Sequence, residues 1–217
     1  NAKGKVVQQL PFFEECQVLH TQPCEHNVPS ETALIYKALV LATKDYVTGN
    51  GFTGALIGLS GGIDSALTLA IAVDALGPQN VSAVMMPYQF TSSMSLEDAK
   101  EQASTQDVHY SSIDINQMVT AFNLSLFELF DGADKDTTEE NIQARVRGVL
   151  LMALSNKWHK MVLATGNKSE MSVGYATLYG DMCGGFAPLK DISKTLVYQL
   201  ANYRNSLSFV IPQRVIS

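Results

Sequence analysis

The chain has no long hydrophobic run. Its apolar stretches, such as residues 161–164, are short and interrupted, whereas a membrane-spanning helix needs about 20 consecutive apolar residues. This excludes a helical membrane protein, so we expect no membrane partner. No secretory signal is visible at the start of the sequence either.

Cysteines are few, and basic residues are not in excess. Cys16, Cys24 and Cys183 have no metal-ligand spacing and form no even set for a disulfide framework, which favours reduced thiols and a cytoplasmic location. The 15 Lys and Arg residues against 21 Asp and Glu residues give a net charge of −6. Proteins that depend on non-specific nucleic-acid contact present a basic face to the phosphates. The sequence therefore argues against a nucleic-acid partner, while nucleotide binding stays open.

What is present is the composition of a single globular domain with a tail. The 217 residues are 46% hydrophobic, which suits one domain with a sizeable core. Residues 1–29 differ from the rest, because they hold Pro11, Pro23 and Pro29 among scattered polar residues. This composition is typical of a tail or linker. The sequence therefore predicts a domain over residues 30–217.

Short apolar runs alternate with helical patterns along that domain. The expected strands cover residues 55–59, 81–86, 110–115 and 161–164. The expected helices begin after Ser30, at Ser65 and at Ser95, and cover residues 116–130 and 139–157, with a polar loop over 131–138. This alternation favours an α/β fold with a doubly wound parallel sheet and helices on both faces. Ligands of such sheets bind at the carboxyl ends of the strands.

The segment after the first expected strand has the residues of a phosphate-binding loop. It reads Gly58-Leu59-Ser60-Gly61-Gly62-Ile63-Asp64-Ser65. Adjacent glycines let the backbone turn sharply and approach a ligand, and backbone amides at a helix start bind anions. Asp64 would repel phosphate unless it holds Mg²⁺. Asp64 is therefore expected to be a metal ligand.

This loop matches neither of two common nucleotide motifs. No Gly-Lys-Ser/Thr follows, so it is not a Walker A loop, and it is not the Gly-x-Gly-x-x-Gly fingerprint. A tight turn whose glycines serve packing alone is the plain alternative. The pattern Ser-Gly-Gly-x-Asp-Ser resembles the PP-loop of ATP pyrophosphatases, which implies an adenine nucleotide alpha hydrolase-like fold and cleavage of ATP between the α- and β-phosphates. The loop alone does not choose among the families that share it.

Three further segments resemble the NAD synthetase family. The first is Glu-Asn-Ile-Gln-Ala-Arg-Val-Arg-Gly over residues 140–148. Asn141 and Arg145 are four residues apart and share a helix face, as do Gln143 and Arg147. Two arginines and two amides near a helix start suit an anionic dinucleotide. A solvated charged face is the alternative reading of this run.

The other two segments follow the fourth expected strand. In Ala-Thr-Gly-Asn-Lys-Ser-Glu over residues 164–170, the resemblance implies that Thr165 contacts ATP and that Glu170 binds metal or lies beside the dinucleotide. The alternative for Glu170 is an acid that stabilises a helix start. Residues 179–194 end in Lys194, which matches an ATP-contacting lysine of the family. Cys183 lies in the same segment, and we expect a small packed residue rather than a catalytic thiol, because no His or acid partner is evident.

Two departures from the ammonia-using branch point to the glutamine-dependent branch of this family. Leu178 stands where that branch has a lysine, and Gly185 stands where it has an aspartate. Residues 87–99 also resemble the glutamine-dependent enzymes. Residues 1–29 are then expected to be a linker and a remnant of a glutaminase (nitrilase-like) domain, because residues 3–15 resemble its last strand. Residues 30–217 are expected to be an ATP-dependent synthetase domain that is incomplete at its C-terminal end.

The resemblance implies a complete set of sites. ATP would be bound by Gly58, Leu59, Ser60, Gly61, Gly62, Ile63, Asp64, Ser65, Thr165 and Lys194. Deamido-NAD would be bound by Asn141, Arg145 and Glu170, and Mg²⁺ by Asp64 and Glu170. Asp64 and Lys194 would be the catalytic residues.

The implied reaction is the ATP-dependent amidation of deamido-NAD (nicotinic acid adenine dinucleotide) to NAD. It passes through an acyl-adenylate, releases AMP and pyrophosphate, and uses ammonia derived from glutamine on another domain. The resemblance also implies a homodimer or a higher homo-oligomer. The alternatives are another PP-loop amidotransferase or thiolation enzyme, such as a GMP synthetase, and a nucleotide-binding domain without chemistry. Two candidate metal acids, Asp64 and Glu170, favour catalysis over the last of these.

Overall fold

The structure, a computed structural model, describes residues 2–19 and 28–217 and is built on a four-stranded parallel sheet. The strands are β1 (Gly54–Gly58), β2 (Val81–Met85), β3 (His109–Ser112) and β4 (Lys160–Leu163), in the spatial order β3-β2-β1-β4. The chain moves outward from β1 to β3 and then returns to place β4 on the other side of β1. The order of the strands therefore reverses between β1 and β4.

The helices connect and cover these strands. They are α1 (Glu31–Gly49), α2 (Ile63–Leu76), α3 (Ser93–Thr105), α4 (Asn116–Phe130), α5 (Thr137–Trp158), α6 (Lys168–Val173), α7 (Lys194–Leu207) and α8 (Gln213–Ile216), with a 3-10 turn η1 at Pro78–Asn80. None of the helices in the described ranges combines the length and the hydrophobicity needed to span a bilayer.

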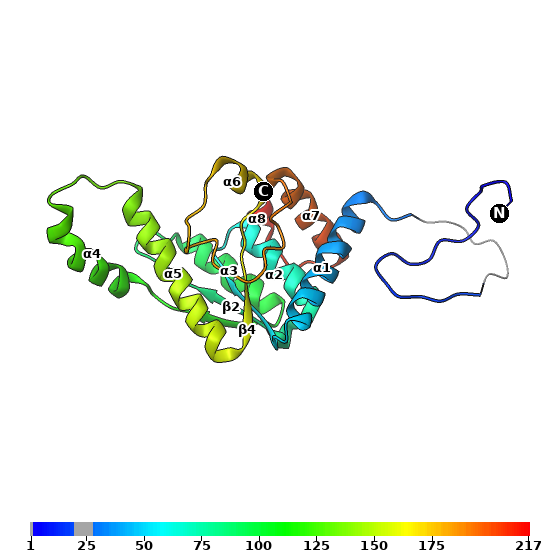
Figure 1. Ribbon diagram of the computed structural model, residues 1–217, viewed down its shortest axis with the longest axis horizontal. Helices are drawn as coiled ribbons and strands as arrows, with labels where there is room; N and C mark the ends of the chain where they lie inside the picture. Colours follow the sequence, from blue (N-terminus) through cyan, green and yellow to red (C-terminus); the bar gives the residue numbers. More distant parts are fainter. Residues whose placement is uncertain (1, 20–27) are drawn as a thin grey trace.

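Both faces of the sheet are buried by helices, as the alternation of side chains along β1 shows. Ala55 and Ile57 pack with residues of α2 and α3 on one face, whereas Leu56 packs with residues of α4 and α5 on the other. Alternate side chains of a strand point to opposite faces. The doubly wound α/β fold predicted from the sequence is therefore confirmed (Figure 1).

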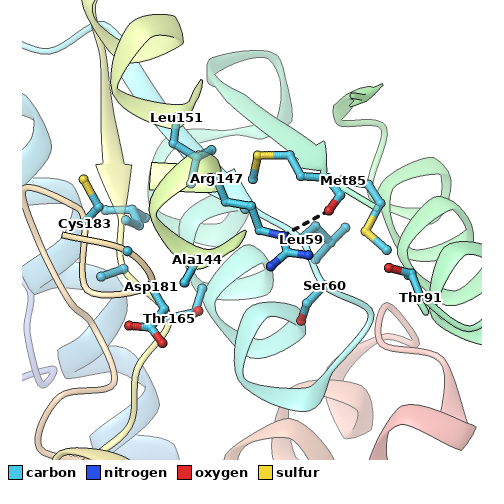
Figure 2. Close-up of a pocket in the computed structure, with 15 residues that line it drawn as sticks. Leu59, Ser60, Met85, Thr91, Ala144, Arg147, Leu151, Thr165, Asp181 and Cys183 are labelled. Atoms are coloured by element: carbon cyan, nitrogen blue, oxygen red, sulfur yellow. Dashed lines mark hydrogen bonds between the residues drawn. The ribbon is translucent and has the colours of Figure 1, made fainter. Parts of the chain in front are cut away.

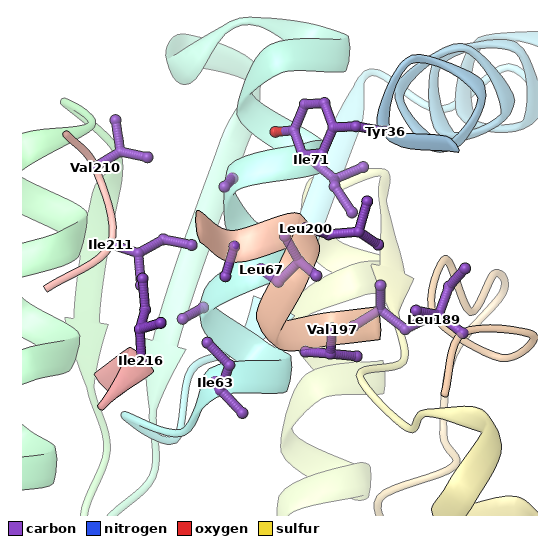
Figure 3. Packing of buried hydrophobic residues seen from close by; sticks show 14 residues of the cluster. Tyr36, Ile63, Leu67, Ile71, Leu189, Val197, Leu200, Val210, Ile211 and Ile216 are labelled. Carbon is purple, nitrogen blue, oxygen red and sulfur yellow. The ribbon is translucent and has the colours of Figure 1, made fainter. Parts of the chain in front are cut away.

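A second helical layer lies outside α2. Leu67 and Ile71 of α2 pack against Val197 and Leu200 of α7, and Tyr36 of α1 closes the cluster (Figure 3). The C-terminal residues Val210, Ile211 and Ile216 belong to the same cluster. The helix that carries Lys194 is thus fixed to the phosphate-loop helix by buried apolar surface.

Polar contacts also fix the register of α7 on α2. Arg204 donates to both carboxylate oxygens of Asp74, from Nε at 2.7 Å and from Nη2 at 2.9 Å. The Tyr36 hydroxyl donates to the same carboxylate at 2.7 Å. Burial, together with the Asp74 carboxylate, raises the pKa of Tyr36 well above its ordinary value, so the hydroxyl remains a donor.

Helices α4 and α5 form an arm at one end of the domain. Figure 1 shows α4 and the first turns of α5 projecting away from the sheet. Val119 is the one buried residue of α4, while Phe122, Leu124, Phe127 and Leu129 are exposed. The arm therefore presents apolar side chains that this chain leaves uncovered.

The N-terminal segment lies apart from this domain. Residues 2–19 contain turns but no helix or strand and extend away from the domain on the side of α1 (Figure 1). Asn1 and residues 20–27, which belong to the predicted tail and linker, lie outside the described residues. The assignment of residues 1–29 to a glutaminase domain and linker stays a prediction.

All four predicted strands are present within one or two residues of their predicted ends, except that β3 stops at Ser112 rather than at residue 115. Three helices begin two residues earlier than the sequence predicts. α3 begins at Ser93 rather than at Ser95, because Ser92 is its N-cap. α2 begins at Ile63, because Gly62 takes the extended N-cap position, and α5 begins at Thr137, because Asp136 and Glu139 form a capping box there. The helices after residue 164 were not delimited from the sequence.

Candidate active site

The phosphate loop joins β1 to α2, and hydrogen bonds of its own serines link its two ends. The Ser60 hydroxyl lies 3.0 Å from the Ser65 hydroxyl, which donates to the Gly62 carbonyl at 3.0 Å. The Gly62 amide donates to the Ser60 hydroxyl at 3.2 Å. Gly62, at the N-terminus of α2, has no side-chain cap. A helix start of this kind carries positive partial charge and backbone donors for an anion.

Gly61 is the point at which the loop meets α3. Its φ is +80°, a conformation that side chains rarely adopt, and a Cβ added there would lie 2.4 Å from the Ser95 carbonyl oxygen. Only glycine satisfies both constraints. The Gly-Gly pair therefore has a packing role of its own, in addition to any approach to a ligand.

Two adjoining cavities meet at this loop. The larger, of about 370 Å³, is lined by residues from the carboxyl ends of β1, β2 and β4, and its walls include Leu59, Met85 and Leu151 (Figure 2). The smaller, of about 160 Å³, is lined mainly by polar side chains such as Asp64 and Glu170, together with Met171 and Met182. Three residues line both cavities: Ser60, Thr165 and Asp181.

The position of these cavities follows from the sheet topology. Ligands of open α/β sheets bind where neighbouring connections leave the sheet in opposite directions. Here that point lies between β1 and β4, and the loops that follow these two strands supply Ser60 and Thr165. An apolar cleft that opens into a polar pocket suits a ligand with an aromatic base at one end and phosphates at the other.

Asp64 is the centre of the polar contacts in the smaller cavity. Its carboxylate forms an ion pair with Lys194, the first residue of α7, and accepts a hydrogen bond from Asn167 Nδ2 at 2.9 Å. Three distant segments therefore converge on one carboxylate. The structure thus brings together Asp64 and Lys194, the two residues expected to be catalytic.

Glu170 lies in the same cavity, but one of its oxygens is already engaged. Its Oε2 accepts from the Asn167 backbone amide at 3.0 Å, and Asn167 Oδ1 accepts from the Glu170 amide at 3.1 Å. This capping box starts α6 and agrees with the alternative reading of Glu170 as a helix-stabilising acid. Within the described ranges, no three His, Cys, Asp or Glu side chains form a metal cluster. Mg²⁺ commonly uses one or two carboxylates plus substrate phosphates, so Asp64 and Glu170 suit a site completed by ATP.

Of the three residues expected to bind the dinucleotide, Glu170 lines the smaller cavity, whereas Asn141 and Arg145 lie outside both cavities. Asn141 Oδ1 accepts from the Thr177 hydroxyl at 2.8 Å, and Arg145 Nε donates to the Leu178 carbonyl at 3.3 Å. Both therefore hold the segment that follows α6. Arg145 also lines an apolar groove of about 220 Å³ between α4 and α5. A substrate that contacts Arg145 would therefore reach from the nucleotide cleft toward the arm.

Comparison with known proteins places the chain in a family. The family model described as NAD synthase matches residues 35–217. The chain belongs to the NAD synthase family. It is 59% identical, over the whole of its length, to the glutamine-dependent NAD(+) synthetase of Acinetobacter baylyi. The chain spans 42% of that protein.

Solved structures of the NAD synthase family have the same fold. A glutamine-dependent NAD+ synthetase from Acinetobacter baumannii, in complex with adenosine diphosphate, superimposes with a TM-score of 0.89 at 58% identity, over 90% of this chain and 38% of that one. An NMN synthetase from Francisella tularensis superimposes with a TM-score of 0.79 at 26% identity, over 87% of this chain and 75% of that one. The fold expected from the PP-loop resemblance is therefore confirmed.

Three residues of the predicted segments have side chains that are buried or partly buried. The Ile63 side chain is buried in the core beneath the loop, so any contact of Ile63 with ATP falls to its backbone. Leu59 is almost fully buried but lines the larger cavity. Cys183 also lines that cavity, and burial raises the pKa of its thiol. A raised pKa keeps the thiol protonated and argues against a nucleophile.

Of two further polar residues at the candidate site, Asn167 was not singled out from the sequence, whereas Arg147 was expected together with Arg145 to suit the dinucleotide. Asn167 is fully buried, joins Asp64 to the start of α6, and has a recognisable signal in the pattern Asn-x-x-Glu. Arg147 lines the larger cavity, whereas Arg145, two residues earlier, does not. The spacing of Arg147 from Ala144 and Leu151 places all three on one helix face.

Proposed function

We propose that this chain is the ATP-dependent synthetase domain of a glutamine-dependent NAD synthetase. In this proposal deamido-NAD reacts with ATP to form an acyl-adenylate and pyrophosphate, and ammonia then converts the acyl-adenylate to NAD with release of AMP. One observation carries the proposal. The phosphate loop and Thr165 lie together at the β1–β4 switch point, where an apolar cleft opens into a polar pocket.

The residues of the polar pocket would act on the leaving pyrophosphate. Negative charge gathers on pyrophosphate as its bond to the α-phosphorus breaks, and donors fixed before the reaction stabilise that charge most effectively. The loop amides, the two serine hydroxyls and the Lys194 ammonium are such donors. Asp64 and Glu170 would hold Mg²⁺, which when bound supplies further positive charge beside the phosphates. The site requires no protein nucleophile, because adenylation itself activates the substrate carboxylate.

The ammonia would come from glutamine on another domain. The relative from Acinetobacter baylyi aligns with the entire chain, including the residues before the family match at residue 35. This supports residues 1–29 as the segment that follows a glutaminase domain. A cytoplasmic location belongs to the same proposal, since ATP and a dinucleotide are charged substrates of the cytoplasm.

Product analysis tests this proposal directly. The full-length protein is incubated with ATP, Mg²⁺, glutamine or ammonia, and one acceptor at a time: deamido-NAD, nicotinic acid mononucleotide or xanthosine monophosphate. We expect NAD, AMP and pyrophosphate in equal amounts with deamido-NAD, and much slower turnover with the other two. Preferred amidation of the mononucleotide would assign a different substrate, and amidation of xanthosine monophosphate would assign a GMP synthetase. Binding of ATP without pyrophosphate release in any mixture would leave a nucleotide-binding domain without chemistry.

Substitution of Arg145 tests the placement of the dinucleotide. Arg145→Ala should raise the KM for deamido-NAD about tenfold or more, since a hydrogen bond to a charged group contributes about 1.5–3 kcal/mol. The KM for ATP should change far less, because Arg145 lies outside the nucleotide cleft. Steady-state kinetics with each substrate varied in turn measures the two values. Equal effects on both KM values would remove Arg145 from the substrate site, and Lys157→Ala at the far end of α5 is the control.

The exposed arm supports a homodimer as part of the proposal. Its apolar residues on α4 adjoin the apolar groove with Arg145, and large exposed apolar patches mark interaction surfaces. A symmetric dimer would cover the same patch on each copy. The substrate contacts of Arg145 would then lie beside the interface.

A double substitution on α4 tests this dimer. Leu124→Glu with Phe127→Glu should convert a dimer to a monomer while leaving the fold intact, because both side chains are exposed in the single chain. Sedimentation velocity measures the state of association. Leu207→Glu, at the end of α7, is the control because Leu207 is also exposed. A monomeric parent protein, or a double variant that stays dimeric, would contradict the assignment of this face.

A further inference from the structure

Arg147 occupies a special position in the larger cavity. It lies on α5 with Ala144 and Leu151, and all three residues line the cleft. Its Nε donates to the Met86 carbonyl at 3.1 Å, just beyond the end of β2. This bond fixes the guanidinium, and Figure 2 shows its free end directed toward Leu59 and Ser60. The two terminal nitrogens are therefore presented to the cavity beside the start of the phosphate loop.

Within the part of the chain that the structure describes, Arg147 forms no ion pair. The ion pairs of the described residues involve Lys194, Arg204 and Arg214, and none involves Arg147. The side chain is half-buried, and desolvation lowers the pKa of its guanidinium. A desolvated charge is costly unless it is paired and hydrogen-bonded. A cation kept unpaired in a cleft with apolar walls is therefore most simply explained by an anionic group of the ligand.

The position of Arg147 indicates which anionic group of the ligand would contact its guanidinium. In the proposed function, the adenosine of ATP fills the larger cavity and the pyrophosphate end fills the smaller one. The α-phosphate joins the two parts, so it must lie where Ser60 and Thr165 line both cavities. Arg147 lines only the larger cavity, and its free nitrogens point toward Ser60. A planar guanidinium can bind two phosphate oxygens at once.

We propose that Arg147 is a catalytic residue that binds the non-bridging oxygens of the α-phosphate, in ATP and again in the acyl-adenylate. This rests on the proposed function for the identity of the reaction. In the first step a substrate carboxylate oxygen forms a bond to the α-phosphorus while the bond to pyrophosphate breaks. In the second step ammonia forms a bond to the carbonyl carbon, the bond to AMP breaks, and a proton is released. The same phosphate group carries charge through both steps, so one fixed cation serves both.

In this proposal Lys194 and Arg147 bind different phosphates of ATP. Lys194 forms an ion pair with Asp64, which lines the smaller cavity, and would stay beside the pyrophosphate, which leaves first. Arg147 would stay with AMP until the end of the reaction. A ligand with an α-phosphate should therefore depend on Arg147, whereas a ligand that lacks phosphate should not.

Paired binding measurements test this with adenosine and AMP on the full-length protein. Arg147→Gln should weaken AMP binding about tenfold to a hundredfold, the range for a charge-assisted hydrogen bond, and should change adenosine binding less than about threefold. Arg147→Lys should recover part of the AMP affinity. Lys157→Gln, which removes an exposed charge from the same helix, should change neither value. Thermal unfolding of each variant confirms that the protein is folded.

Turnover gives a second and separate measurement. Arg147→Gln should lower kcat with deamido-NAD about a hundredfold or more, the range for removal of one donor to developing charge. An equal loss of affinity for adenosine and AMP would overturn the inference, because Arg147 would then contact the base or the ribose. An unchanged kcat would also overturn it. The binding comparison needs no turnover. If the wild-type protein makes no NAD, the proposed function is refuted; if Arg147→Gln still loses affinity for AMP but not for adenosine, the contact between Arg147 and the α-phosphate stands.

Discussion

Replacing Asp64 by asparagine should lower the rate of pyrophosphate release about a thousandfold without unfolding the protein. The neutral side chain cannot hold a cation beside the phosphates, and it also removes the partner of Lys194. The loss of a metal contact and a fixed charge amounts to several kcal/mol in the transition state, and each 1.36 kcal/mol is a factor of ten in rate. The effect on stability should be small, because the ion pair is partly exposed to solvent and such pairs contribute roughly 0–1 kcal/mol.

The measurement is pyrophosphate release at saturating ATP and deamido-NAD over a range of Mg²⁺ concentrations, with thermal unfolding in parallel. Asp45→Asn is the matched control, because Asp45 is exposed on α1. Full activity in the Asp64 variant would remove Asp64 from the metal site. Lost activity together with a large fall in the unfolding temperature would instead assign Asp64 a structural role.

Replacing Gly61 by alanine should have the largest effect on stability. The new Cβ would lie 2.4 Å from the Ser95 carbonyl oxygen and 2.8 Å from the Ser95 Cα, both of which are backbone atoms. Since backbone cannot rotate away like a flexible side chain, either the loop or the start of α3 must move. Strain at φ +80° adds to this contact. We expect the free energy of unfolding to fall by about 2–4 kcal/mol and ATP binding to weaken at least tenfold.

Urea denaturation and ATP titration measure the two effects, and the chain offers a matched control. Gly51 has a φ of +77°, but a Cβ added there would meet nothing within 4 Å. Gly51→Ala therefore reports the backbone strain alone, about 1–2 kcal/mol. If both variants lost the same stability, the close approach of the loop to α3 would have no energetic consequence.

The fold was predictable because its signals are local. Each strand is a short apolar run bounded by turn residues, and helices such as α1 have a capping residue at Ser30 and an apolar stripe. The helices after residue 164 were harder to delimit. α7 is amphipathic and capped by Ser193, yet it packs on α1 and α2 rather than on the sheet, so no strand-helix-strand pattern announces it. Its place depends on contacts with residues more than a hundred positions away in the sequence.

The candidate site was predictable in part for the same reason. The phosphate loop is contiguous, so one pattern identified it together with Asp64. Lys194 came from the family resemblance alone, because nothing local relates it to Asp64. Arg145 and Arg147 show the opposite difficulty. They are only two residues apart in the motif, but a helix turns by about 100° per residue, so Arg145 reaches the arm and Arg147 reaches the nucleotide cleft.

The two ion pairs between α2 and α7 determine how the candidate site forms during folding. Asp64 and Asp74 are ten residues apart on α2, and Lys194 and Arg204 are ten residues apart on α7. Two parallel helices tied at points about 15 Å apart cannot slide past each other without breaking both pairs. The docking of α7 therefore sets the position of the Lys194 ammonium.

A nascent chain in which only β1 and α2 have been synthesised therefore contains the phosphate loop but lacks the Lys194 cation beside it. Lys194 follows its partner Asp64 by 130 residues, so the loop acquires this cation only when nearly all of the described domain has been synthesised and has folded back. Contacts of such sequence separation form late, because the chain must first be closed into a long loop. In the proposed function, the phosphate site is therefore complete only after the whole domain has folded, and the loop without α7 would lack the Lys194 cation.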